Sequence, residues 1–199
     1  MSRTSIPEVM VGCSLILSAV RDASPITADV AAFPVQGDHT TINHAHQLVW
    51  PGHRLYTSRG NPDLRHSHSI GNLQGGQPPR TAILYVHQPE CAPNLSEAAW
   101  FAQELARPSV NPEVLIVAPK YHLPRVYMAV LTELIRQMQI RCVDDYAKLP
   151  LIIPCISPTS APESAEEEST QLITRERGLG TLVSHEQLLR YLSVKGLKK

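Results

Sequence analysis

The chain has 199 residues, enough for one domain with a sizeable core, and we expect residues 1–199 to form a single domain. Its 18 basic and 18 acidic residues cancel, which argues against a general nucleic-acid binder, because such proteins are usually basic. The four cysteines show neither metal-ligand spacing nor the pattern of a small disulfide scaffold, so we expect reduced thiols in a cytoplasmic protein.

An N-terminal helix is predicted over about residues 6–21. Ser5 and Glu8 have the spacing of a capping box, and Pro7 suits the first helical turn. The apolar stretch that follows is too short to span a bilayer, so we expect no membrane partner. A signal peptide is the alternative interpretation, although no clear cleavage site follows.

Strands and helices then alternate along the chain. Apolar runs predict strands at residues 30–35, 54–58, 81–87 and 114–118. Apolar residues at helical spacing predict helices after the first, third and fourth of these strands. This alternation predicts an α/β fold with a mainly parallel sheet and right-handed crossovers. Residues 140–143 and 151–153 are weaker strand candidates, the second being flanked by prolines.

The remaining segments are predicted loops and a last helix. Residues 59–80 are rich in glycine and proline, which favours a long loop that could cover a site. Residues 157–170 are polar and acidic, and we expect a mobile loop there. Ser184 and Gln187 cap a C-terminal helix within residues 184–199.

The strand, loop and helix between residues 113 and 139 carry the clearest functional signal. The loop lies at the carboxyl end of a strand, where ligands bind in open α/β sheets. It holds His122 and Arg125, and Pro124 suits the first turn of the helix. An arginine at a helix start is electrostatically unfavourable unless an anion binds there. The alternative is that Arg125 extends into water or pairs with a nearby carboxylate.

Two residues after the first strand should meet this loop where the strand order reverses. Gly37 allows close approach of the backbone or a positive φ. Asp38 could bind ribose hydroxyls or a metal, although its alternative role is to cap the next helix. His44 and His46 would point in different directions on a helix, so we predict no metal site.

Two other short motifs could contribute to a site. Ser58, Arg59 and Gly60 could form a phosphate cradle, or a plain turn. Asn94 and Glu97 have the spacing of a helix cap and its partner. Glu97 could instead neutralise the arginine of the later loop or act as a general base.

Taken in order, these motifs resemble the YdcF/SanA/ElyC-like domain family. The resemblance implies a Rossmann-like three-layer sandwich over about residues 26–145. It also implies, by comparison with the soluble members, a nucleotide-like ligand such as S-adenosylmethionine. The matching motifs are Ala28-Asp29 before the first strand, Ser58-x-Gly60, Asn94-x-x-Glu97 and His122-x-Pro124-Arg125. The departures are Arg59 for a usual glycine, Ala98 for a usual asparagine, and Pro119-Lys120 for a usual serine or threonine.

Three functional hypotheses follow. The first is binding of a small anionic, nucleotide-like ligand, held by Arg125 and oriented or protonated by His122. The second is a phosphoryl or glycosyl hydrolase that uses His122 with Glu97 or Asp38 as acid and base. The third is a non-catalytic interaction module whose proline-rich and acidic loops form the partner surfaces.

Overall fold

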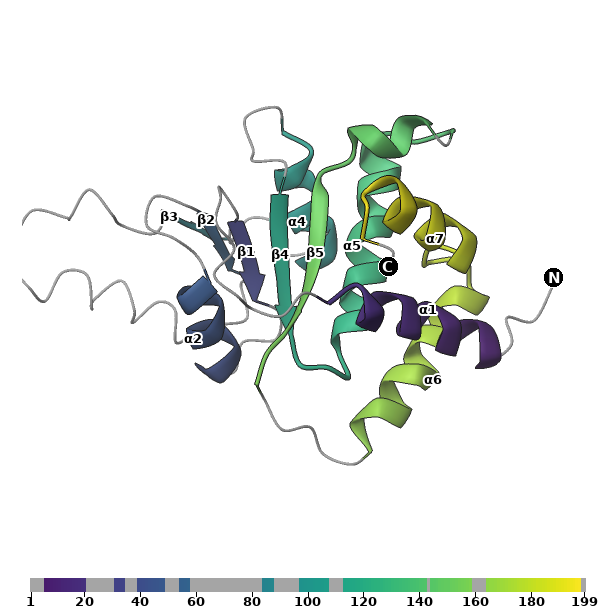
Figure 1. Ribbon diagram of the computed structural model, residues 1–199, viewed down its shortest axis with the longest axis horizontal. Coiled ribbons are helices and arrows are strands. Elements are labelled where there is room, and N and C mark those ends of the chain that lie inside the picture. Colours follow the sequence, from purple (N-terminus) through teal and green to yellow (C-terminus); the bar gives the residue numbers. More distant parts are fainter. Residues whose placement is uncertain are drawn as a thin grey trace, which may run out of the picture.

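The computed structural model describes residues 6–20, 31–34, 39–48, 54–57, 84–87, 97–107, 113–142, 144–158 and 164–197. Within this part of the chain, helices and strands mix around one parallel sheet (Figure 1). The strands are β1 (Ala31–Pro34), β2 (Arg54–Thr57), β3 (Leu84–His87), β4 (Glu113–Ala118) and β5 (Leu151–Ile156). The helices are α1 (Ile6–Ser18), α2 (His39–Leu48), α4 (Glu97–Leu105), α5 (Leu123–Gln137), α6 (Ala165–Gly178), α7 (His185–Val194) and the short 3-10 helix η1 (Asp144–Lys148).

The sheet has the strand order β3-β2-β1-β4-β5, and every neighbouring pair is parallel. Strands β1 to β3 extend the sheet in one direction, and β4 and β5 extend it in the other. The order therefore reverses between β1 and β4, where Pro34 lies opposite Val117. The predicted parallel sheet is confirmed, and so is the expectation that the ends of the first and fourth strands meet.

Alternate residues of the strands pack against different helices. In β4, Leu115 and Val117 face α2 and contact the cluster formed with Ala45. Val114 and Ile116 face the other way, into the larger cluster with α4 and α5. Helices α1, α6 and α7 pack beside α5 and join this larger cluster (Figure 1). None of the described helices is long and apolar enough to span a bilayer.

Helix α5 is the centre of the larger cluster. Leu123, Tyr127, Val130 and Leu134 recur every three or four residues and are completely buried. Each such side chain stabilises the fold by roughly 1.5–3 kcal/mol relative to its exposed state. The helix ends just before Gln139, whose φ of 51° stops further helical hydrogen bonding. The burial of α5 fixes its first turn, and with it the loop that precedes the helix.

Strand β5 is one edge of the sheet that the described residues form, and two buried tyrosines satisfy outer backbone groups of this strand. The Ile152 N–H donates to the Tyr191 hydroxyl at 2.7 Å, and that hydroxyl donates to the Pro150 carbonyl at 2.8 Å. The Tyr127 hydroxyl donates to the Ile152 carbonyl at 2.8 Å. These side chains cover an edge that would otherwise expose unpaired backbone groups.

The structure corrects the prediction for the last strand. Residues 140–142 form no strand, and the fifth strand is β5, which includes Pro154. Proline lacks the N–H that a central strand needs, but an edge strand tolerates it because one side has no neighbouring strand. Pro154 lies opposite Ile116 of β4 without interrupting the pairing.

The structure also corrects the predicted acidic loop. The prediction of a loop is wrong for residues 165–170, which form the first turns of α6. Glu166, Glu167 and Glu168 lie in the first turn, where negative charge stabilises the positive end of a helix. Residues 159–163 and the predicted loop 59–80 lie outside the described residues.

Candidate functional site

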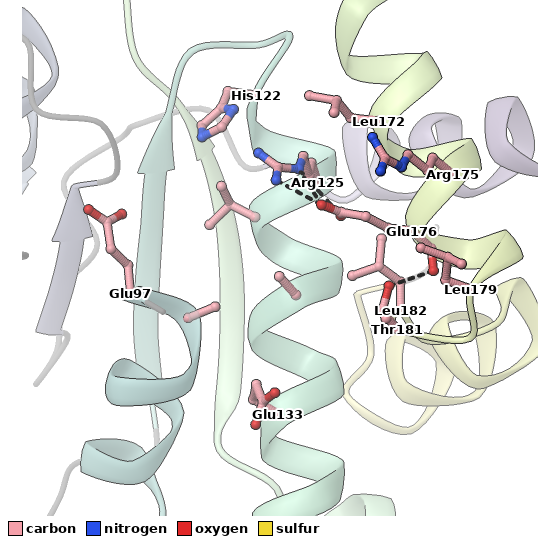
Figure 2. Close-up of a pocket in the computed structure, with 13 residues that line it drawn as sticks. Glu97, His122, Arg125, Glu133, Leu172, Arg175, Glu176, Leu179, Thr181 and Leu182 are labelled. Carbon is pink, nitrogen blue, oxygen red and sulfur yellow. Dashed lines mark hydrogen bonds and ion pairs between the residues drawn. The ribbon is translucent and has the colours of Figure 1, made fainter. Parts of the chain in front are cut away.

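A groove of about 640 Å³ lies along α5, between α4 and α6 (Figure 2). This volume falls in the range of small-molecule binding sites. Its polar and charged lining residues are Glu97, His122, Arg125, Glu133, Arg175, Glu176 and Thr181. Its apolar lining residues are Ala98, Val126, Ala129, Leu172, Leu179 and Leu182.

The groove begins at the carboxyl end of β4. A tight turn follows this strand, and the N–H groups of His122 and Leu123 both donate to the Pro119 carbonyl at 2.9 Å. The turn delivers His122 to the groove as the residue that caps α5, and Arg125 follows in the first turn. Glu97, at the first position of α4, reaches the same groove from the neighbouring helix.

The structure therefore brings together three of the residues singled out from the sequence, namely Glu97, His122 and Arg125. The other candidates lie outside the described residues. These are Gly37, Asp38, Ser58, Arg59, Gly60 and Asn94.

His122 is a buried histidine with only 6% of its surface exposed. Burial, with a smaller contribution from the nearby charge of Arg125, lowers the pKa of His122 to about 4. The imidazole is therefore neutral at neutral pH and presents one N–H donor and one acceptor nitrogen. The ring of Tyr121 lies beside it, with the two ring centres 6.2 Å apart.

Arg125 forms an ion pair with Glu176 across the contact between α5 and α6. Its Nη2 lies 2.8 Å from Glu176 Oε1, and its Nε donates to both carboxylate oxygens at 3.2 and 3.3 Å. The partner is thus Glu176 rather than Glu97. This arrangement matches the alternative interpretation of Arg125, pairing with a nearby carboxylate. It also leaves the Arg125 side chain 32% exposed beside the groove.

Arg175 and Glu176 were not predicted from the sequence as site residues, because α6 itself was not predicted. Arg175 is exposed at the groove and forms no ion pair with another residue in the described ranges. A signal for α6 is the four-residue spacing of its buried positions, Ala165, Ser169 and Ile173. Two of these residues are small, so the apolar pattern is weak.

The described residues include no group of three histidine, cysteine or acidic side chains that could hold a metal ion. His44 and Cys155 are close, with Nε2 and Sγ 3.9 Å apart on the α2 face of the sheet. Burial raises the pKa of Cys155 to about 11, so the thiol is protonated at neutral pH. This pair is therefore a packing contact between α2 and β5, away from the groove.

Comparisons of the chain with protein-family models, curated proteins and solved structures gave no match. The function is therefore inferred from the chemistry of the groove.

Proposed function

We propose that the chain binds a small anionic ligand in the groove beside α5, at the carboxyl edge of a Rossmann-like parallel sheet. One observation carries this proposal. The loop after β4, the start of α4 and the guanidinium of Arg175, which pairs with no acidic side chain among the described residues, all line the groove. In open α/β sheets, ligands bind outside the carboxyl ends of the strands, near the point where the strand order reverses.

Two arginines and three glutamates line the groove. Glu133 and Glu176 each pair with an arginine, which leaves positive charge near the start of α5 that suits an anion. Arg125 shares its charge with Glu176, whereas Arg175 has no acidic partner in the described part of the chain. The neutral ring of His122 can donate an N–H to the anion. Charge-assisted hydrogen bonds from a guanidinium are stronger than those between neutral groups.

The resemblance to YdcF-like domains makes nucleotides and S-adenosylmethionine the first ligands to test. A groove of about 640 Å³ is large enough for molecules of this size. Arg125 and Arg175 would hold the phosphate or carboxylate, and His122 would orient it. Glu97 would contact a hydroxyl or amino group of the ligand.

Isothermal titration of the full chain with nucleotides, S-adenosylmethionine and sugar phosphates tests the proposal. Arg175→Ala should weaken binding by about tenfold or more, because it removes a charged hydrogen-bond donor. Arg190→Ala is the control, since Arg190 is exposed on α7 and does not line the groove. Failure of every anion to bind, or binding unaffected by both Arg125→Ala and Arg175→Ala, would overturn the proposal.

A hydrolase is the second candidate, favoured by the presence of His122 and Glu97 in one groove. A neutral imidazole is ready to accept a proton, although a pKa of about 4 makes it a weak base. Glu97, at the start of α4, could then act as its acidic partner. A screen with chromogenic phosphate and glycoside substrates tests this candidate, and turnover that His122→Gln leaves unchanged would reject it.

A further inference from the structure

We infer that the ligand of this groove is an anion that carries an aliphatic chain, which lies along the leucines that α6 and the segment after it contribute. This inference rests on the proposed function and specifies the class of ligand. The leucines are Leu172 on α6, and Leu179 and Leu182 after it. Among the described residues, no phenylalanine, tyrosine or tryptophan lines the groove, and its one aromatic ring is that of His122 at the polar end. The wall is therefore aliphatic.

Leu179 is a large apolar residue of the groove that is exposed to water. It is 69% exposed, so a large apolar side chain stands in water at the groove. Single exposed leucines are common on protein surfaces, but this one adjoins the apolar positions Val126 and Ala129 of α5 in one cavity. A chain bound along these residues would remove the leucine from water.

The cationic side chains lie at one end of the groove, where Leu172 accompanies them, and the other two leucines lie further along. Figure 2 shows His122, Arg125 and Arg175 at one end, and Leu179 and Leu182 further along α5 toward Glu133. The rise of an α-helix makes the strip from Arg125 to Glu133 about 12 Å long. An anionic head group at the arginine end would direct an extended chain along this strip.

The apolar wall offers little to a nucleobase. The Thr181 hydroxyl donates its proton to the Glu176 carbonyl, so that donor is already engaged. The acidic side chain at the far end of the strip is engaged too, because Glu133 pairs with Arg136 at 2.6 Å. A nucleobase needs hydrogen-bond partners for its polar edge, whereas an alkyl chain needs only apolar contact. This stretch of the groove, away from Glu97 and the arginines, therefore fits an alkyl chain better than a base.

Titration calorimetry with inorganic phosphate and with ethyl, butyl and octyl phosphate measures the contribution of the chain. Affinity should rise by about fourfold for each methylene that becomes fully buried, and about twofold where half of its surface stays in water. Octyltrimethylammonium has the same chain with the opposite charge and should bind much more weakly. Adenosine monophosphate tests a nucleobase on the same anionic group.

Leu179→Ser should reduce the affinity for octyl phosphate and leave that for ethyl phosphate unchanged. Val194→Ser is the matched control, because Val194 is also an exposed apolar residue, at 41%, but lies on α7 outside the groove. Both positions are on the surface, so neither change should prevent folding.

The outcomes separate this inference from the proposed function. If alkyl phosphates of all lengths bind equally, or Leu179→Ser has no more effect than Val194→Ser, the aliphatic chain is rejected and anion binding stands. Tighter binding of adenosine monophosphate than of octyl phosphate would also reject the aliphatic chain and leave anion binding standing. If no anion binds, both proposals fail.

Discussion

Arg125 and Glu176 join the first turn of α5 to the last turns of α6, with Nη2 and Oε1 2.8 Å apart. An arginine at a helix start faces the positive end of the helix, and the carboxylate of Glu176 offsets that unfavourable placement. The same contact fixes α6 as a wall of the groove. The pair therefore holds α6 against α5 and also lines the candidate site.

A double-mutant cycle with Arg125→Ala and Glu176→Ala should give a coupling energy of about 0.5–1 kcal/mol in urea unfolding. The pair has good two-pronged geometry but is about a third exposed, so water and salt screen it. The comparison pair is Lys120 and Glu166, which are 3.4 Å apart and mostly exposed. Its coupling should be close to zero, and equal coupling for the two pairs would contradict the expected role.

His122 should make the protein less stable in acid. Its pKa is about 4 when folded and about 6.5 when unfolded, so below pH 6.5 the unfolded chain binds more protons. Stability is therefore lost as the pH falls from about 6.5 to 4, by about 3 kcal/mol in total from this residue. Urea unfolding across this range should show a weaker pH dependence for His122→Gln than for the parent chain.

His185→Gln is the control for this measurement, because His185 is only partly buried, at the start of α7. Arg125→Ala should raise the pKa of His122 measured by NMR, since the guanidinium is the second cause of its depression after burial. A His122 ring that titrates near its ordinary pKa would contradict both expectations.

Tyr191→Phe should destabilise the protein by about 1–3 kcal/mol, because it leaves buried backbone groups of the edge strand without hydrogen bonds. The affected groups are the Ile152 N–H and the Pro150 carbonyl. Thermal or urea unfolding measures the loss. Tyr121→Phe is the matched control, because Tyr121 is only partly buried and its hydroxyl has no hydrogen bond to the described residues. A similar loss in both variants would contradict the assigned role.

Local sequence signals predicted the first four strands of the sheet. Runs such as Val114 to Ala118 are apolar without a break, as expected of a strand buried on both faces. The helix after it combines a proline in the first turn with strict helical spacing, and α5 lies where that pattern predicts. Such signals belong to a few adjacent residues, so they can be recognised without knowledge of the tertiary fold.

The elements that the sequence analysis missed or predicted wrongly are those that depend on tertiary contacts. The proline of β5 is tolerated because β5 is an edge strand of the sheet. Tyr127 and Tyr191 bond to backbone groups on the outer side of this strand. Helix α6 buries small residues and has glutamates in its first turn, which in sequence look like an acidic loop. Six of the thirteen lining residues of the groove, Arg175 and Glu176 among them, lie on α6 or just after it, so this wall could not be predicted without the helix.

Ser184→Ala should cost about 1 kcal/mol, because it removes the cap of α7. The Ser184 hydroxyl accepts the Gln187 N–H at 3.2 Å, and the Gln187 side chain accepts the Ser184 N–H at 2.9 Å. This capping box is the one predicted from the sequence. Ser193→Ala, on the exposed end of the same helix, changes the same atom and should have little effect. Urea unfolding compares the two variants. Equal stability of both would mean that the box does not hold the start of α7.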